Sequence, residues 1–166
     1  MYRVLKDFIK DWEYETEVTL KMLDNLTDDS LKQRVTPEGR TLGYIAWHLV
    51  LTIGEMMGKT GLTPDAPAED TPVPAHASKI RNAFEKAARS ILSQIEEKWN
   101  DNTLFEEVPM YGESWQNGVT LKALVMHQTH HRGQMTVLMR QAGLKVPGAY
   151  GPSKEEWAAM GMEAPF

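Results

Sequence analysis

Hydrophobic side chains recur at intervals of three or four residues along four long segments of this chain. This spacing places apolar side chains on one face of a helix, and it predicts α-helices over about residues 2–26, 41–58, 77–100 and 120–142. The second helix is expected to end between Gly58 and Gly61. Polar residues occupy the intervening positions, so each helix should bury one face and expose the other. Four amphipathic helices of this length predict an all-α protein whose simplest arrangement is a four-helix bundle.

The segments between these helices contain residues that interrupt helices. The connection from the second helix to the third contains four prolines, Pro64, Pro67, Pro72 and Pro74. Proline removes a hydrogen bond from a helix interior, so this connection is expected to be an exposed loop. Residues 101–120 should form an ordered loop with room for a short hairpin, and residues 154–160 a short C-terminal helix. No repeat or second core interrupts the pattern, so we expect a single domain over residues 1–166.

Composition limits the classes of partner. The formal net charge is −5, whereas nucleic-acid-binding modules usually carry a basic face, so we expect no nucleic-acid partner. No apolar run approaches the roughly 18 residues of a membrane-spanning helix, and residues Met1–Asp7 lack the apolar stretch of a signal peptide. We therefore expect a cytoplasmic protein without a membrane partner.

The chain contains no cysteine, which excludes disulfides, thiolate zinc sites and a cysteine nucleophile together. It also lacks a Gly-rich phosphate loop, a G-x-S-x-G nucleophile motif and an H-E-x-x-H zinc motif. The Glu-x-x-His pairs of di-iron bundles are absent as well. The histidines are therefore the main candidates for chemistry.

Three of the five histidines, His127, His130 and His131, lie within five residues of the fourth predicted helix. Residues four apart lie one turn apart on the same face, so His127 and His131 present two imidazoles with the spacing that a divalent metal needs. His48 lies in the apolar second helix and completes a three-histidine site if the two helices pack together. His130 projects about 100° away from His131 and should flank the site. His76 is expected at the surface.

The alternative to a metal site is a set of ordinary core histidines. A single histidine on an apolar helix face is more often a hydrogen-bonded core residue than a ligand, and the H-x-x-x-H spacing also occurs by chance. Three imidazoles buried in one seam, however, cost desolvation unless each has a partner, and one metal ion supplies all three partners. We therefore favour a metal site at His48, His127 and His131 over a metal-free bundle.

Other polar residues near these positions are weaker candidates. Gln128, Gln134 and Glu55 lie on or near the same faces and could orient the imidazoles, although such residues are more often solvated. Arg132 is expected to form an ordinary salt bridge. Gly133 lies within a helix, where glycine costs about 1 kcal/mol relative to alanine. A close helix crossing would explain it.

The histidine motifs resemble those of a known protein family. Residues 42–49 (LGYIAWHL) and residues 127–134 (HQTHHRGQ) are similar in order and spacing to the motifs of the DinB-like (DinB/YfiT) proteins. The tail at residues 146–157 is similar to that of a bacterial subgroup. The resemblance covers the whole chain. It implies a bundle of up-down-down-up topology, a homodimer, and zinc or nickel bound by His48, His127 and His131.

The same resemblance suggests an activity. Characterised relatives in that family include metal-dependent transferases and isomerases that use low-molecular-weight thiols such as bacillithiol, mycothiol or glutathione, whereas many members have no known activity. The first hypothesis is thus a thiol-dependent transferase acting on a small-molecule substrate, with the thiol supplied by a co-substrate because the chain has none. The alternatives are a metal-water hydrolase and a non-enzymatic stress-response or small-molecule-binding protein with a structural or vestigial metal site.

Overall fold

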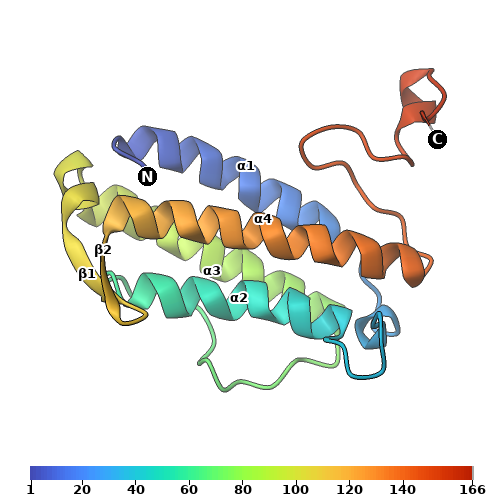
Figure 1. The fold of residues 1–166 in the computed structure, drawn as a ribbon, viewed down its shortest axis with the longest axis horizontal. Coiled ribbons are helices and arrows are strands. Elements are labelled where there is room, and N and C mark those ends of the chain that lie inside the picture. The colour runs from blue at the N-terminus through green and yellow to red at the C-terminus, as the bar shows by residue number, and fades with distance from the viewer. Residues whose placement is uncertain (166) are drawn as a thin grey trace.

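The computed structural model describes residues 1–165 and places four long helices side by side around a shared core (Figure 1). They are α1 (Leu5–Leu23), α2 (Leu42–Gly58), α3 (Ala77–Lys98) and α4 (Asn117–Gln141). In Figure 1, α1 and α4 run in one direction and α2 and α3 in the other, which gives the up-down-down-up topology that the resemblance implied. α1 and α2 each lie beside both α3 and α4. The predicted four-helix bundle is therefore confirmed.

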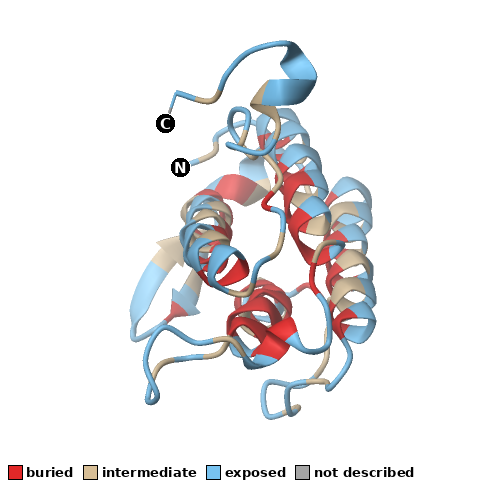
Figure 2. Ribbon diagram, turned by 90° about the vertical axis from the view of Figure 1, so that its right-hand side faces the viewer, coloured by how far each residue is buried: buried red, intermediate tan, exposed pale blue. Residues whose placement is uncertain are grey.

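The apolar face of each helix is directed toward the other helices. Figure 2 shows the buried residues gathered on these inward faces. Phe8 and Trp12 of α1 are fully buried and stack with their ring centroids 5.9 Å apart. Trp12 also donates a 3.1 Å hydrogen bond from Nε1 to the carbonyl oxygen of Ala88 in α3, so its polar atom is satisfied inside the core. No helix within residues 1–165 combines the length and hydrophobicity needed to cross a membrane.

The connections contain short elements of their own. The proline-containing loop runs along the outside of the bundle from α2 to α3, as predicted (Figure 1). Residues 101–120 contain the short hairpin considered from the sequence. It consists of β1 (Glu107–Met110) paired antiparallel with β2 (Glu113–Gln116). Its turn residues Tyr111 and Gly112 both have positive φ, 52° and 86°, as a tight type I′ turn requires. Three 3₁₀ helices complete the chain: η1 (Ser30–Lys32), η2 (Asp101–Phe105) and η3 (Trp157–Met160). The predicted C-terminal helix is thus reduced to the 3₁₀ helix η3.

Two helices begin at residues other than those predicted. α1 starts at Leu5 instead of residue 2, because the backbone N–H of Tyr2 donates to the carbonyl oxygen of Gly118 at 3.0 Å. A Cβ at position 118 would lie 2.2 Å from the carbonyl oxygen of Tyr2, so this approach requires glycine. α4 starts at Asn117 instead of residue 120, because the buried Asn117 side chain donates to the carbonyl oxygen of Thr103 at 3.0 Å. Gly118 therefore belongs to the helix and not to the loop.

The expectation of a close helix crossing at Gly133 is wrong. Gly133 is exposed, and a Cβ built there would meet no atom within 4 Å. The conformational cost of glycine at this helical position is therefore not offset by packing.

Replacing Gly133 with alanine is expected to raise the free energy of unfolding by about 0.5–1 kcal/mol, because alanine has the higher helix propensity and restricts the unfolded chain. Urea denaturation of the two proteins measures the difference. Gly112→Ala is the control, since its φ of 86° makes alanine unfavourable there and stability should fall. A loss of stability in Gly133→Ala would show that the position has a packing role.

Arg132 and Glu15 form a buried ion pair between α4 and α1, with side chains 2% and 8% exposed. Arg132 also donates to the backbone carbonyl of Glu15 at 3.0 Å and to Oγ1 of Thr19 at 2.9 Å. The hydroxyl of Tyr150 donates to the Glu15 carboxylate at 2.8 Å, which ties the C-terminal segment to the same pair. The salt bridge predicted for Arg132 is confirmed, and its burial makes it part of the core.

Glu15→Gln is expected to lower the free energy of unfolding by about 3 kcal/mol, because it leaves the Arg132 charge buried without its counter-ion. The matched control is Glu17→Gln, two residues further along α1, where the side chain is exposed and its partner Lys21 is half exposed. That substitution should change stability by less than about 0.5 kcal/mol. Equal effects of the two substitutions in urea denaturation would contradict a structural role for the buried pair.

Candidate metal centre

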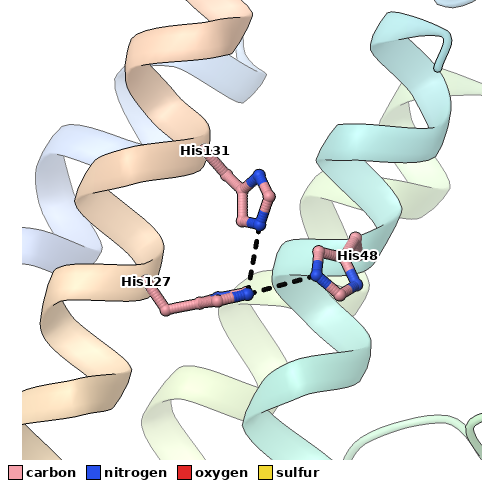
Figure 3. Close-up of side chains that lie close together, drawn as sticks. All are labelled: His48, His127 and His131. Atoms are coloured by element: carbon pink, nitrogen blue, oxygen red, sulfur yellow. Dashed lines mark hydrogen bonds between the residues drawn. The ribbon is translucent and has the colours of Figure 1, made fainter. Parts of the chain in front are cut away.

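The three histidines selected from the sequence meet between α2 and α4 (Figure 3). His48 comes from α2, and His127 and His131 come from adjacent turns of α4. The Nε2 atom of His127 lies 3.2 Å from Nε2 of His48 and 3.1 Å from Nε2 of His131. The candidate ligand nitrogens of all three lie within 4.8 Å of one another. The fold therefore brings these side chains into a single cluster that could hold a metal ion.

The donor atoms fit a metal ion better than they fit shared protons. A zinc ion binds imidazole at about 2.0–2.1 Å, and a tetrahedral arrangement then separates two ligand nitrogens by about 3.3 Å. Two of the three separations, 3.1 and 3.2 Å, are close to this value, and all three candidate nitrogens lie within 4.8 Å of one another. Without a metal, Nε2 of His127 faces two other Nε2 atoms, and its single N–H cannot make a well-aligned hydrogen bond to both. A central cation would instead be held by one lone pair from each ring.

The buried side chain of Gln128 links the two helices beside the cluster. Its Nε2 donates to the carbonyl oxygen of Leu49 at 2.9 Å. Gln128 follows His127 in the chain and Leu49 follows His48, so this bond joins α4 to α2 next to two candidate ligands. Gln128 was a weak candidate for contacting an imidazole, and instead it positions the helices that carry the imidazoles.

Gln134 orients His131, a role that its position in the sequence allowed as an alternative to ordinary solvation. Oε1 of Gln134 lies 2.7 Å from Nδ1 of His131, and Nε2 of Gln134 lies 3.1 Å from Nε2 of His130. A side-chain carbonyl only accepts hydrogen bonds, so Nδ1 of His131 carries the hydrogen and Nε2 presents its lone pair to the cluster. His130 flanks the cluster and does not belong to it.

Burial keeps these imidazoles in the neutral form. It is the main cause that lowers the pKa of His127 to about 4, and the neighbouring histidines add to the effect. Burial also lowers the pKa of His48 and of His131, and the positive charge of Arg40 contributes at both. For His131 the hydrogen bond to Gln134 acts in the opposite direction. Neutral imidazole is the form that binds metals, so the site is ready for a cation at neutral pH.

Two residues beside the cluster were missed from the sequence. The ring of Tyr44 stacks on His48, with centroids 6.2 Å apart and planes inclined by 14°. The guanidinium of Arg40 lies over the Tyr44 ring, 5.2 Å from its centroid. The sequence did offer one signal for both residues. Positions 40, 44 and 48 are four apart, which places their side chains along one side of α2 and the turn before it.

The remaining candidates lie elsewhere. Glu55 forms no hydrogen bond with a histidine within residues 1–165, and its carboxylate lies near Tyr111. Burial and this carboxylate raise the pKa of Tyr111 to about 12. His76 is exposed, as predicted, and pairs with Asp28 at 2.8 Å.

Known proteins resemble this chain over nearly all of its length. A model of the DinB family matches residues 1–164. The uncharacterized protein YrdA of Bacillus subtilis (strain 168) is 51% identical over 165 residues, which cover 99% of each chain. The crystal structure of a DinB-like protein from Bacillus cereus ATCC 10987 has 44% sequence identity and a TM-score of 0.87, covering 90% of this chain and 100% of that one. A DinB-like protein from Bacillus subtilis, YjoA, has 14% identity and a TM-score of 0.68 over 86% and 96% of the two chains, and so shares the fold.

Gln134→Leu is expected to weaken metal affinity by about 10- to 100-fold, because His131 loses the acceptor that fixes its ring and its tautomer. Competition with a chromogenic chelator at neutral pH measures the affinity. Gln134→Glu keeps an acceptor and should retain tight binding. Gln141→Leu, an exposed position on the same helix, is the control and should match the wild type. Unchanged affinity in Gln134→Leu would show that the hydrogen bond does not support a metal ligand.

Proposed function

The chain belongs to the DinB family, and on this premise we propose that it is a metal-dependent enzyme of the thiol-dependent transferase type. The observation that carries the proposal is the cluster of three neutral histidines, to which no fourth protein ligand is added within residues 1–165. Divalent metals with three protein ligands and open positions are typical of catalytic sites, whereas structural sites are usually closed by four. Zinc or nickel is the proposed metal, since both bind imidazole well.

The roles of the residues follow from their contacts. A bound metal supplies Lewis-acid chemistry, which lowers the pKa of a coordinated thiol or water. His48, His127 and His131 would bind the ion, and Gln134 would keep the His131 lone pair directed at it. Because the chain has no cysteine, the thiol must come from a small co-substrate such as bacillithiol, mycothiol or glutathione. A second small molecule would accept the thiol group.

Two alternatives use the same histidines. A metal-water hydrolase needs the same three ligands and no thiol. A non-enzymatic stress-response or small-molecule-binding protein with a structural or vestigial metal site is supported by one observation: within residues 1–165, no carboxylate hydrogen-bonds to the three histidines to act as a general base. The homodimer and the cytoplasmic location stay predictions.

Elemental analysis of the untagged protein tests the metal site. Wild type and His130→Ala should each contain about one zinc or nickel ion per chain, because His130 lies outside the cluster. His131→Ala should lose the ion, since two remaining imidazoles bind it much more weakly. His130→Ala is a matched control, because it removes a neighbouring imidazole from the same helix turn. Equal metal content in His131→Ala and wild type would rule out this site.

Activity is tested separately on the metal-loaded protein. Consumption of bacillithiol, mycothiol or glutathione in the presence of a panel of small electrophiles should depend on the metal and be lost in His131→Ala. Activity should persist in His130→Ala. A metal-loaded wild type that consumes none of the three thiols would favour the non-enzymatic alternative over the transferase.

A further inference from the structure

A cavity of about 360 Å³ lies between the segment before α2 and the C-terminal half of α4. Its walls are mainly apolar, and the side chains that form them are Val35, Ile45, Val137 and Leu138. Two polar side chains, Arg40 and Gln134, also line it. Its volume is near the lower end of the range for small-molecule sites, so it suits a compact ligand.

Both polar residues of the cavity connect it to the histidine cluster. Gln134 accepts the hydrogen bond from Nδ1 of His131 at 2.7 Å. Arg40 lies over the ring of Tyr44, which in turn stacks on His48. The cavity therefore adjoins the cluster at two points. Gln134 of α4 contacts His131 directly, and Arg40, which precedes α2, reaches His48 through Tyr44. A ligand seated there lies beside the proposed reaction centre.

The guanidinium of Arg40 is available to a ligand. Arg81, Arg89, Arg132 and Arg140 each form an ion pair with a carboxylate, whereas no ion pair within residues 1–165 involves Arg40. Its side chain is exposed, and its guanidinium contacts the face of the Tyr44 ring. A guanidinium binds a carboxylate through two parallel hydrogen bonds, which favours that anion over a neutral group.

Two other hollows of the surface carry acidic residues instead. The cavity that Tyr44 and His48 help to line, about 220 Å³, also contains Glu69 and Asp70. A groove of about 400 Å³ between α1 and α3 contains Arg89, but also Glu13 and Glu17. Negative charge at both places disfavours an anion, so an anionic ligand should prefer the Arg40 cavity to either of these two hollows.

We propose that the Arg40 cavity binds the substrate, and that this substrate is a small molecule with an apolar portion and a carboxylate. The apolar portion fills the space between Ile45 and Val137, and the carboxylate pairs with Arg40. This assignment rests on the proposed function, because it names the class of molecule that the same centre would modify.

Binding of octanoate to the zinc-loaded wild type, followed by isothermal titration calorimetry, tests the assignment. Octylamine, cationic at neutral pH, is the probe of opposite charge. Octanoate should bind at least about tenfold more tightly than octylamine, because only the carboxylate can accept charge-assisted hydrogen bonds from Arg40. Arg40→Gln should weaken octanoate binding by about tenfold or more and should not weaken octylamine binding, because the substitution removes a like charge. Val137→Trp, at a half-exposed position, should weaken octanoate binding by filling the cavity.

Arg89→Gln is the matched control, because it makes the same substitution in the other arginine-containing groove and should leave octanoate binding unchanged. Equal affinity in Arg40→Gln and wild type would overturn the assignment. Loss of octanoate binding in His131→Ala but not in Arg40→Gln would overturn it too, since the carboxylate would then bind the metal. Binding that depends on Arg40 in a protein without thiol turnover would leave the cavity assigned and remove only the transferase.

Discussion

The position of α2 relative to α4 is the constraint on which the candidate metal centre depends. A single helix places His127 and His131 side by side, but the third imidazole comes from another helix. A slip of one residue moves a side chain by about 1.5 Å along its helix and rotates it by about 100°, which would remove His48 from the cluster. The hydrogen bond from Gln128 to the Leu49 carbonyl opposes such a slip, because it joins the residues that follow two of the histidines.

Rotation of α4 is restrained from its other side. His131 and Arg132 are consecutive, yet the His131 ring contacts the ring of His48 in α2 and Arg132 pairs with Glu15 in α1. Residues one apart project about 100° from each other, so the two contacts fix the angle of the helix about its axis. A buried ion pair is costly to desolvate and contributes less to net stability than its Coulomb attraction implies. Its effect here is to make other rotations of α4 unfavourable, since they would leave Arg132 or Glu15 unpaired.

Local features of the sequence were predictable and long-range contacts were not. Helical periodicity located the four helices, and the four-residue spacing placed His127 and His131 on one face. The start of α1 depends on a contact between Tyr2 and Gly118, which are far apart in the chain, so no local pattern predicts it. Gly133 illustrates the opposite failure, because a helical glycine suggests close packing and the structure leaves it open. Arg40 precedes α2, so only its four-residue spacing from Tyr44 and His48 pointed to it.

With a metal ion bound at the three histidines, the charges around the cluster would favour anionic ligands. Three neutral histidines leave a bound dication with its full positive charge, and no carboxylate within residues 1–165 joins them as a ligand. The protein also supplies no thiolate. An anion that arrives from solution would therefore gain the full attraction of such a metal, and a thiol bound to it would be favoured as its thiolate. The unpaired Arg40 extends this positive region to one side, while Glu69 and Asp70 limit it on the other. Such an asymmetric field would orient a charged substrate before any reaction begins.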